Sequence, residues 1–294
     1  MRVTQSMLYN SYVNGIESQQ ESIYNLNNEI STGMKINSPS DDPLGAGELL
    51  SSNSALSELN QTGKNVSSAS SYLGSAANAL ASANNILTSI QDLAIQGADG
   101  TQNASTRSTI ANQVQSLSDQ LITLGNTQVG DTYIFSGYKT NTAAFDSSGN
   151  FQGDSNSYQI SIGSSTMTVG MNGGEVFKGT GIPGGVDVFQ TVSNLITALN
   201  SNNQAGVQST ISALQASSQQ VLNAASEVGA RSRRLTSIQS DLGNSTTEVQ
   251  KVISNLQNAD LTKVIGDLQL GQVALQASMA SASQVLSLNI FNYI

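Results

Sequence analysis

Cysteine, histidine and tryptophan are absent from this chain of 294 residues, and only 3 residues are proline. Without cysteine and histidine, the chain cannot form disulfides, thiol nucleophiles or the usual ligand sets for zinc. No run of about 18 apolar residues is present, so the sequence predicts no membrane-spanning helix. The first residues also lack the apolar core of a cleaved secretory signal. We therefore expect no catalytic residue, no metal site and no cofactor, and these absences alone would favour a cytosolic protein.

Charged residues are scarce and mostly acidic, with 20 aspartates and glutamates against 11 lysines and arginines. The formal net charge of -9 repels phosphate backbones and anionic membrane surfaces, so we expect neither nucleic acid nor membrane as a partner. Serine, threonine, asparagine, glutamine and alanine are abundant instead. Burying an amide or a hydroxyl group costs much less free energy than burying an ion. A surface of this kind is suited to packing against copies of itself.

Both ends of the chain carry residues spaced alternately three and four apart, which predicts helices with one apolar stripe each. The N-terminal stripe consists of Tyr9, Tyr12, Ile16, Gln19, Ile23, Leu26 and Ile30. The C-terminal stripe consists of Leu261, Ile265, Leu268, Gln272, Leu275, Met279, Ala282, Leu286 and Tyr293. Asp260 is the expected N-cap of the second of these helices. We expect the apolar members of both stripes to form a subunit-assembly surface, pairing with each other or with the equivalent helices of neighbouring subunits.

The centre of the chain has the same helical spacing, interrupted by one glycine-rich segment. A long run from Leu59 to Ala94 alternates large and small residues along one helix face, and further stripes follow at residues 110–124, 188–199 and 207–256. The stretch 97–103 is the expected turn between the first two of these helices. Between residues 133 and 185 helical periodicity disappears, and short alternating segments at 157–162 and 165–169 predict strands.

These patterns predict a mainly α protein in which long coiled-coil-like helices from both termini pack antiparallel, with a small β-rich insertion. We expect three domains. Residues 1–42 and 260–294 form a terminal coiled-coil domain, residues 43–132 and 186–259 form a helical bundle, and residues 133–185 form a β-rich outer domain.

The terminal stripes are narrow, and Gln19 and Gln272 interrupt them with amides. Ordering the backbone of such a segment costs more free energy than one narrow stripe recovers on burial. We therefore expect the terminal domain to be disordered in the monomer and to become helical in a polymer.

The segment 31–48, with the sequence STGMKINSPSDDPLGAGE, resembles the N-terminal signature of the bacterial flagellin family. Its loop, Pro39-Ser40-Asp41-Asp42-Pro43, is similar to that of the family members at the hook-filament junction, since filament flagellins have an alanine after the aspartates. Five further stretches resemble the same family members: residues 131–145, 228–231, 254–261, 275–277 and 287–294. The resemblance as a whole extends over about two thirds of the chain.

The resemblance implies a flagellin-like structural subunit with no enzymatic activity. Such proteins are exported unfolded through the flagellar type III apparatus with an uncleaved N-terminal signal. They form a helical ring layer that joins the first hook-associated protein to the flagellin filament, and they are required for filament attachment and motility. The resemblance also implies a cytoplasmic export chaperone that binds the C-terminal segment, and a location outside the cell at the hook-filament junction.

Several alternatives stay open for individual residues. The loop that holds Asp41 and Asp42 is either a simple helix-loop-helix corner or a corner that also contacts a neighbouring subunit. A metal site is not expected there, because further ligands are lacking nearby. Asp42 before Pro43 is suited to cap the following helix. The tyrosines of the two stripes are either recognition anchors or ordinary packing residues. The cluster of Arg231, Arg233 and Arg234 is interpreted as a source of salt bridges rather than as an anion site.

Three other functions remain as alternatives. A filament flagellin would polymerise by itself into long filaments. A surface adhesin would act through the β-rich insertion. An exported enzyme, such as a wall hydrolase, would need two carboxylates facing a cleft, and the acidic residues of this chain are instead scattered along polar helix faces.

Overall fold

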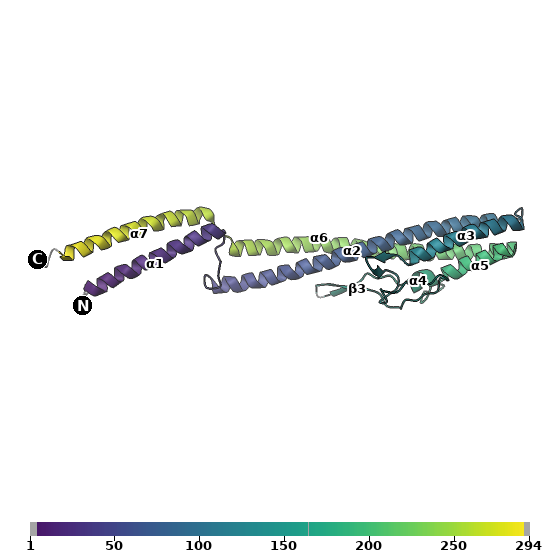
Figure 1. Cartoon of the computed structure of the whole chain (residues 1–294), viewed down its shortest axis with the longest axis horizontal. Helices are drawn as coiled ribbons and strands as arrows, with labels where there is room; N and C mark the ends of the chain where they lie inside the picture. Colours follow the sequence, from purple (N-terminus) through teal and green to yellow (C-terminus); the bar gives the residue numbers. More distant parts are fainter. Residues whose placement is uncertain (1–4, 164, 291–294) are drawn as a thin grey trace. The chain divides into compact units, whose positions relative to one another are not determined.

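A computed structural model of the chain describes residues 5–163 and 165–290 and confirms a mainly helical protein with a small strand insertion (Figure 1). The helices are α1 (Gln5–Thr32), α2 (Pro43–Ala98), α3 (Ala104–Gly125), α4 (Gly173–Lys178), α5 (Val188–Asn200), α6 (Gln204–Gln257) and α7 (Leu261–Ile290). The strands are β1 (Gln128–Val129), β2 (Thr132–Tyr133), β3 (Gln159–Ile162) and β4 (Ser165–Thr168). The chain divides into two compact units, one combining residues up to Ser57 with those from Ser245 onward, the other spanning Glu58–Asn244.

In the unit Glu58–Asn244, α2 and α6 run antiparallel and bury the alternating run that the sequence predicted (Figure 1). The residues of this stripe between Val66 and Ala94 are almost inaccessible to solvent. Val221, Val228 and Leu235 of α6 are buried with them. Alanines at every second position of the stripe let the facing helix approach closely, while leucines fill the space between the helices. The predicted turn at 97–103 also falls between α2 and α3, as the sequence indicated.

At the far end of this unit, α3 and α5 pack beside α2 and α6 around a second core. Arg107 lies inside this end with only 4% of its surface exposed. Its Nε donates to the carbonyl of Gly97 at 2.8 Å, one Nη donates to the carbonyl of Asp99 at 2.9 Å, and the other donates to the Oδ1 of Asn202. The guanidinium therefore satisfies carbonyls that the end of α2 leaves without helical partners.

The insertion is a compact set of loops with short strands. β3 and β4 form an antiparallel hairpin in which Ile160 pairs with Met167, and both side chains are buried. Four phenylalanines meet beneath the loops, with ring centroids 4.9–5.7 Å apart: Phe135, Phe145, Phe177 and Phe189. Aromatic packing of this kind stabilises a region that has little regular secondary structure.

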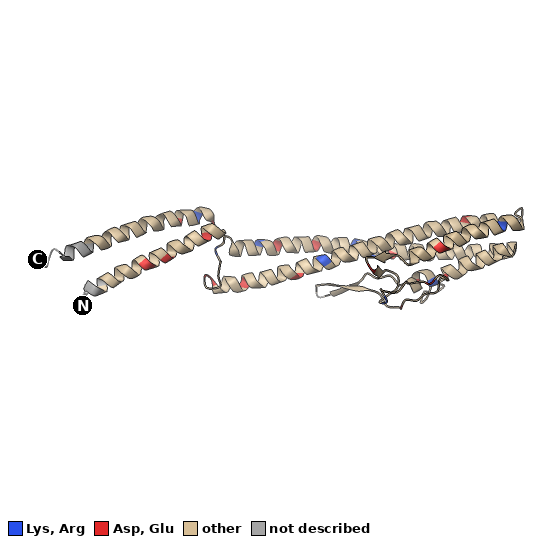
Figure 2. Ribbon diagram, in the orientation of Figure 1, with Lys and Arg blue, Asp and Glu red and all other residues tan. Residues whose placement is uncertain are grey.

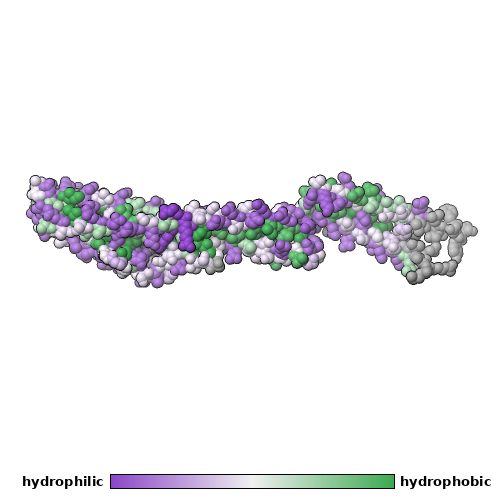
Figure 3. Space-filling view, turned by 180° about the vertical axis from the view of Figure 1, so that it is seen from behind, coloured by the Kyte–Doolittle hydropathy of each residue, from purple (hydrophilic) through white to green (hydrophobic). Residues whose placement is uncertain are grey.

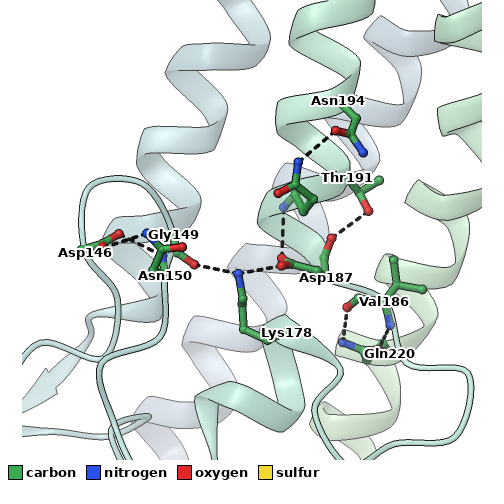
Figure 4. A network of polar contacts seen from close by, with 10 residues as sticks. Asp146, Gly149, Asn150, Lys178, Val186, Asp187, Thr191, Asn194 and Gln220 are labelled. Carbon is green, nitrogen blue, oxygen red and sulfur yellow. Dashed lines mark hydrogen bonds and ion pairs between the residues drawn. The ribbon is translucent and has the colours of Figure 1, made fainter.

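Polar contacts attach this insertion to the helices (Figure 4). The Lys178 ammonium is 2.6 Å from the carboxylate of Asp187, which also caps α5 by accepting from the amide of Gln190. Gln220 of α6 is buried, and its side chain both accepts from and donates to the backbone of Val186 and donates to the carbonyl of Val176. The insertion is thereby held to the start of α5 by an ion pair and to α6 through main-chain groups.

Tyr72 of α2 connects the helical core to the insertion. Its side chain is buried, and the hydroxyl donates to the carbonyl of Ile134. Burial raises the pKa of Tyr72 to about 12, with the nearby Tyr158 adding to the shift, because the phenolate would lie away from water.

This shift predicts a loss of stability at alkaline pH. The folded state favours the protonated phenol, so its contribution is complete below the ordinary pKa of 10 and is lost as pH rises through about 12. We expect about 2–3 kcal/mol of the unfolding free energy to disappear across this range. Urea denaturation of wild type, Tyr72→Phe and the exposed control Tyr138→Phe at pH 8 and pH 11.5 measures it. An equal alkaline loss in wild type and Tyr72→Phe would show that Tyr72 is not responsible.

Within residues 5–163 and 165–290, no helix combines the length and the apolar character needed to cross a membrane.

Candidate functional site

The terminal helices α1 and α7 pack side by side and antiparallel (Figure 1). On α1 most of the half-buried residues belong to the predicted stripe, and Val13 and Glu29 are half-buried beside it. The half-buried stripe residues are Tyr12, Ile16, Gln19, Ile23, Leu26 and Ile30. Tyr9 differs, because 53% of its surface is exposed. The structure therefore brings the N-terminal stripe against α7 of the same chain.

The predicted stripe of α7 is divided between two sides of the helix. We define the inner face of α7 as the buried and half-buried residues Val264, Leu268, Gly271, Leu275, Ser278 and Ala282. We define its side face as Leu261, Ile265, Gln272 and Met279, which are exposed. Val264 and Gly271 were missed from the sequence, although both continue the spacing of three and four through Leu268. Leu286 lies beyond the part of α7 whose side chains the structure describes, and Tyr293 lies outside the described residues.

Gln19 and Gly271 form a polar contact within this pair. The side-chain amide of Gln19 donates to the carbonyl of Gly271 at 3.3 Å. Gly271 is buried, and a Cβ there would lie 3.4 Å from the Cγ1 of Ile23. Because glycine has no side chain, α1 approaches the backbone of α7 closely enough for Gln19 to reach it. The amide that weakens the apolar stripe thus makes a specific contact.

The helical conformation breaks between α1 and α2 and again between α6 and α7, and the two breaks lie beside each other. Gly33 ends α1 with a φ of 71°, and Met34 forms an isolated antiparallel bridge with Asn258. The amide of Lys35 donates to the carbonyl of Gln257 at 2.6 Å, and the amide of Ala259 donates to the carbonyl of Gly33 at 3.0 Å. Asp260 then caps α7 as predicted, accepting from the amide of Thr262 at 3.0 Å. We call this paired break the joint, residues 33–35 with 257–259.

The loop Pro39-Ser40-Asp41-Asp42-Pro43 lies between α1 and α2. The Asp41 carboxylate accepts from the amides of Asn37 and Ser38 and from the Ser38 hydroxyl at 2.7–2.9 Å. These bonds, led by the Ser38 amide, hold the pKa of Asp41 below its ordinary value. Asp42 caps α2 as predicted, since its Oδ1 accepts from the amide of Gly45 at 2.9 Å, and Pro43 is the first helical residue. Pro39, Ser40 and Pro43 are exposed at the surface of this corner.

Acidic and basic residues are scattered along the helices (Figure 2). Within the described ranges, no group of three or more acidic residues is arranged to hold a metal ion. Arg231 forms a salt bridge with Glu227 one helical turn away and donates to the carbonyl of Gly170, in line with the salt-bridge interpretation.

Comparisons with known proteins agree with this architecture. Residues 3–140 match the family described as the bacterial flagellin N-terminal helical region. Over 314 aligned residues the chain is 28% identical to flagellar hook-associated protein 3 of Salmonella typhimurium, covering 99% of each chain. It is 26% identical to the protein of the same name from Escherichia coli, again covering 99% of each.

Solved structures show the same fold. A Vibrio parahaemolyticus protein assigned to the flagellar hook-associated proteins is 27% identical, with a TM-score of 0.68 over 74% of this chain and 100% of that one. The FlgL protein of Bacillus cereus is 17% identical with a TM-score of 0.60, covering 69% of this chain and 99% of that one, and supports the fold alone. Over its full length the chain is therefore similar to flagellar hook-associated protein 3, and residues 3–140 match the flagellin family.

Proposed function

We propose that this chain is a structural subunit of the bacterial flagellum, located outside the cell, that joins the hook to the flagellin filament. The observation that carries the proposal is the full-length similarity to hook-associated protein 3, together with two terminal helices that pair along their apolar stripes. The mechanism is mechanical. Burial of apolar helix faces between subunits supplies the free energy of attachment, and no bond is made or broken.

We further propose the individual partners. Copies of the chain form a ring or helical layer, with the first hook-associated protein on one side and flagellin on the other. A cytoplasmic export chaperone covers the C-terminal segment before secretion. In this proposal residues 1–42 and 260–294 serve assembly, being disordered in the monomer and helical in the polymer. Residues 43–132 with 186–259 form the helical bundle domain of each subunit, and residues 133–185 form its β-rich outer domain.

Deleting the gene tests the function directly. We expect cells of the deletion strain to keep their hooks but to lose their filaments and their motility, because flagellin then has no layer on which to assemble. Electron microscopy of the cells and swimming assays measure both effects, and expression of the full-length chain from a plasmid is the control. Filaments still attached to hooks in the deletion strain would refute the proposal.

The filament flagellin alternative is separated by a second measurement. A flagellin seeded with filament fragments grows long filaments by itself, whereas a junction subunit stops after a short layer. We expect the purified chain to give no elongation of filament seeds in light scattering.

A further inference from the structure

Asparagine is followed by glycine at two places in the chain, Asn14-Gly15 and Asn172-Gly173. This dipeptide is prone to deamidation, because glycine has no side chain to hinder the approach of its nitrogen to the amide carbon of the asparagine side chain. The nitrogen attacks that carbon, ammonia leaves, and the resulting succinimide takes up one water molecule to give aspartate or isoaspartate. The two dipeptides of this chain lie in very different surroundings.

Asn172-Gly173 is held firmly inside the β-rich insertion. Asn172 has only 4% of its surface exposed, and its side-chain oxygen accepts from the amide of Gly174 at 2.8 Å. The amide of Gly173 donates to the carbonyl of Phe135 at 2.8 Å, and a Cβ at Gly173 would lie 2.7 Å from that same oxygen. Both the attacking nitrogen and the side chain are thus fixed, so we expect this dipeptide to be stable in the folded chain.

Asn14-Gly15 lies on the exposed side of α1. Both residues are exposed, and nothing lies within 4 Å of the position that a Cβ of Gly15 would occupy. The φ of Gly15 is not positive, so neither packing nor backbone conformation requires a glycine here, although glycine destabilises a helix interior relative to alanine. Hydrophilic residues alternate with hydrophobic ones on the surface next to the grey atoms in Figure 3.

The helical conformation protects Asn14-Gly15 while α1 is intact. In a helix the amide of each residue donates to a carbonyl one turn earlier, and a ψ of about −42° holds the glycine nitrogen away from the asparagine side chain. Ring closure needs this nitrogen to be free and to approach the amide carbon, so α1 must first unfold locally. A monomer whose terminal domain is disordered, as proposed above, lacks this protection.

We infer that Asn14-Gly15 is a deamidation site at which helix formation in the assembled protein blocks the reaction; this inference rests on the proposed ordering of α1 on assembly. Isoaspartate leads the main chain through the side-chain methylene, which adds one atom to the backbone. The hydrogen-bond spacing of a helix cannot continue across that extra atom. A subunit modified at Asn14 therefore forms no continuous α1 and is excluded from the layer, so the site disables subunits that stay unassembled for long.

Peptide mapping by mass spectrometry tests the inference on the full-length chain. Purified monomer is kept in mildly alkaline buffer, and the aspartate and isoaspartate formed at Asn14 and at Asn172 are measured in the same samples. We expect Asn14 to deamidate about tenfold faster or more, because Asn172 reacts only after its surroundings unfold. Equal rates at the two positions would overturn the inference and leave the proposed function intact, since this comparison involves no assembly.

Two matched variants separate the chemistry of the dipeptide from the fold. Gly15→Ala places a methyl group beside the attacking nitrogen, and Asn14→Gln lengthens the side chain so that only a larger, more slowly formed ring can close. Both should lower the modification at residue 14 several-fold without changing the rate at Asn172, and both should retain filaments in the deletion strain. An unchanged rate at Asn14 in the Gly15→Ala variant would overturn the inference.

Assembled protein gives a second measurement. One growing culture supplies both isolated flagella and the chain released into the medium, and targeted mass spectrometry quantifies isoaspartate at residue 14 in each fraction. We expect about tenfold less isoaspartate in the flagella, because helical α1 blocks the reaction and modified subunits are excluded. Equal isoaspartate in the two fractions would overturn the inference. Filaments on cells of the deletion strain would instead overturn the proposed function.

Discussion

Replacing Ile23 by aspartate is expected to leave hooks without filaments, lowering the number of filaments per cell about tenfold or more. Ile23 lies half-buried between α1 and α7, and its Cγ1 packs over the backbone of Gly271. A carboxylate at this place would lose water without gaining a partner, which costs about 2 kcal/mol or more in each subunit. Because the loss recurs in every copy of an assembled layer, the layer fails even where each subunit is only moderately weakened.

The neighbouring Tyr24 provides the matched control. Its side chain is 72% exposed, so Tyr24→Asp adds the same charge to the same turn of α1 without entering the contact with α7. We expect Tyr24→Asp to retain most filaments, counted by electron microscopy. In dilute solution both variants should melt like wild type, since the terminal domain is proposed to order only on assembly. Strong amide hydrogen-exchange protection of residues 9–30 in the dilute wild-type monomer would contradict that account.

Replacing Arg107 by methionine is expected to lower the unfolding free energy of the unit Glu58–Asn244 by about 3 kcal/mol or more. The methionine fills most of the same space but leaves the carbonyl of Gly97 without the guanidinium donor, while the carbonyl of Asp99 keeps only the amide of Gln102. The loss of the charged donor at the buried Gly97 accounts for most of the expected decrease in unfolding free energy.

Two further substitutions make this measurement specific. Arg107→Lys keeps the charge but cannot reach three acceptors at once, so an intermediate loss is expected. Arg233→Met removes an exposed cation from α6 and should change the unfolding free energy by less than about 0.5 kcal/mol. Equal urea midpoints for wild type and Arg107→Met would show that water replaces the guanidinium at no cost.

The helices and their ends could be predicted because several local signals agree. In the run from Leu59 to Ala94, spacing, residue size and length indicate one long buried helix face, and the structure confirms it from Thr62 onward. Asp42 and Asp260 were expected as N-caps, and both accept hydrogen bonds from the first turn of their helices. The hairpin β3–β4 also follows the alternation that predicted it.

The orientation of α7 could not be predicted, and the reason is physical. Apolar and small residues lie on several sides of α7, so the spacing of three and four can be followed through more than one set of positions. The prediction selected Leu261, Ile265 and Met279 as part of the stripe facing a partner helix, whereas Val264 and Gly271 pack against α1. Glycine carries no hydropathy signal, although its carbonyl is what Gln19 contacts.

The structural role of Arg107 was also missed. Its partners include two main-chain carbonyls, which a sequence pattern does not reveal. One signal was present: a cation in the first turn of a helix is unfavourable next to the helix dipole, so Arg107 needed another reason for its position. Gln220 is a similar case, because its partners are the backbone groups of Val176 and Val186.

The joint has a consequence for how freely this protein can change over evolutionary time. Its two fastening hydrogen bonds, from Lys35 to Gln257 and from Ala259 to Gly33, use only main-chain atoms. Any residue other than proline supplies the same donor and acceptor, so the side chains at Lys35, Gln257 and Ala259 can diverge without loosening it. Gly33 is the exception, since its positive φ disfavours every other residue. The side chains of the joint can therefore change during evolution while its backbone geometry stays the same.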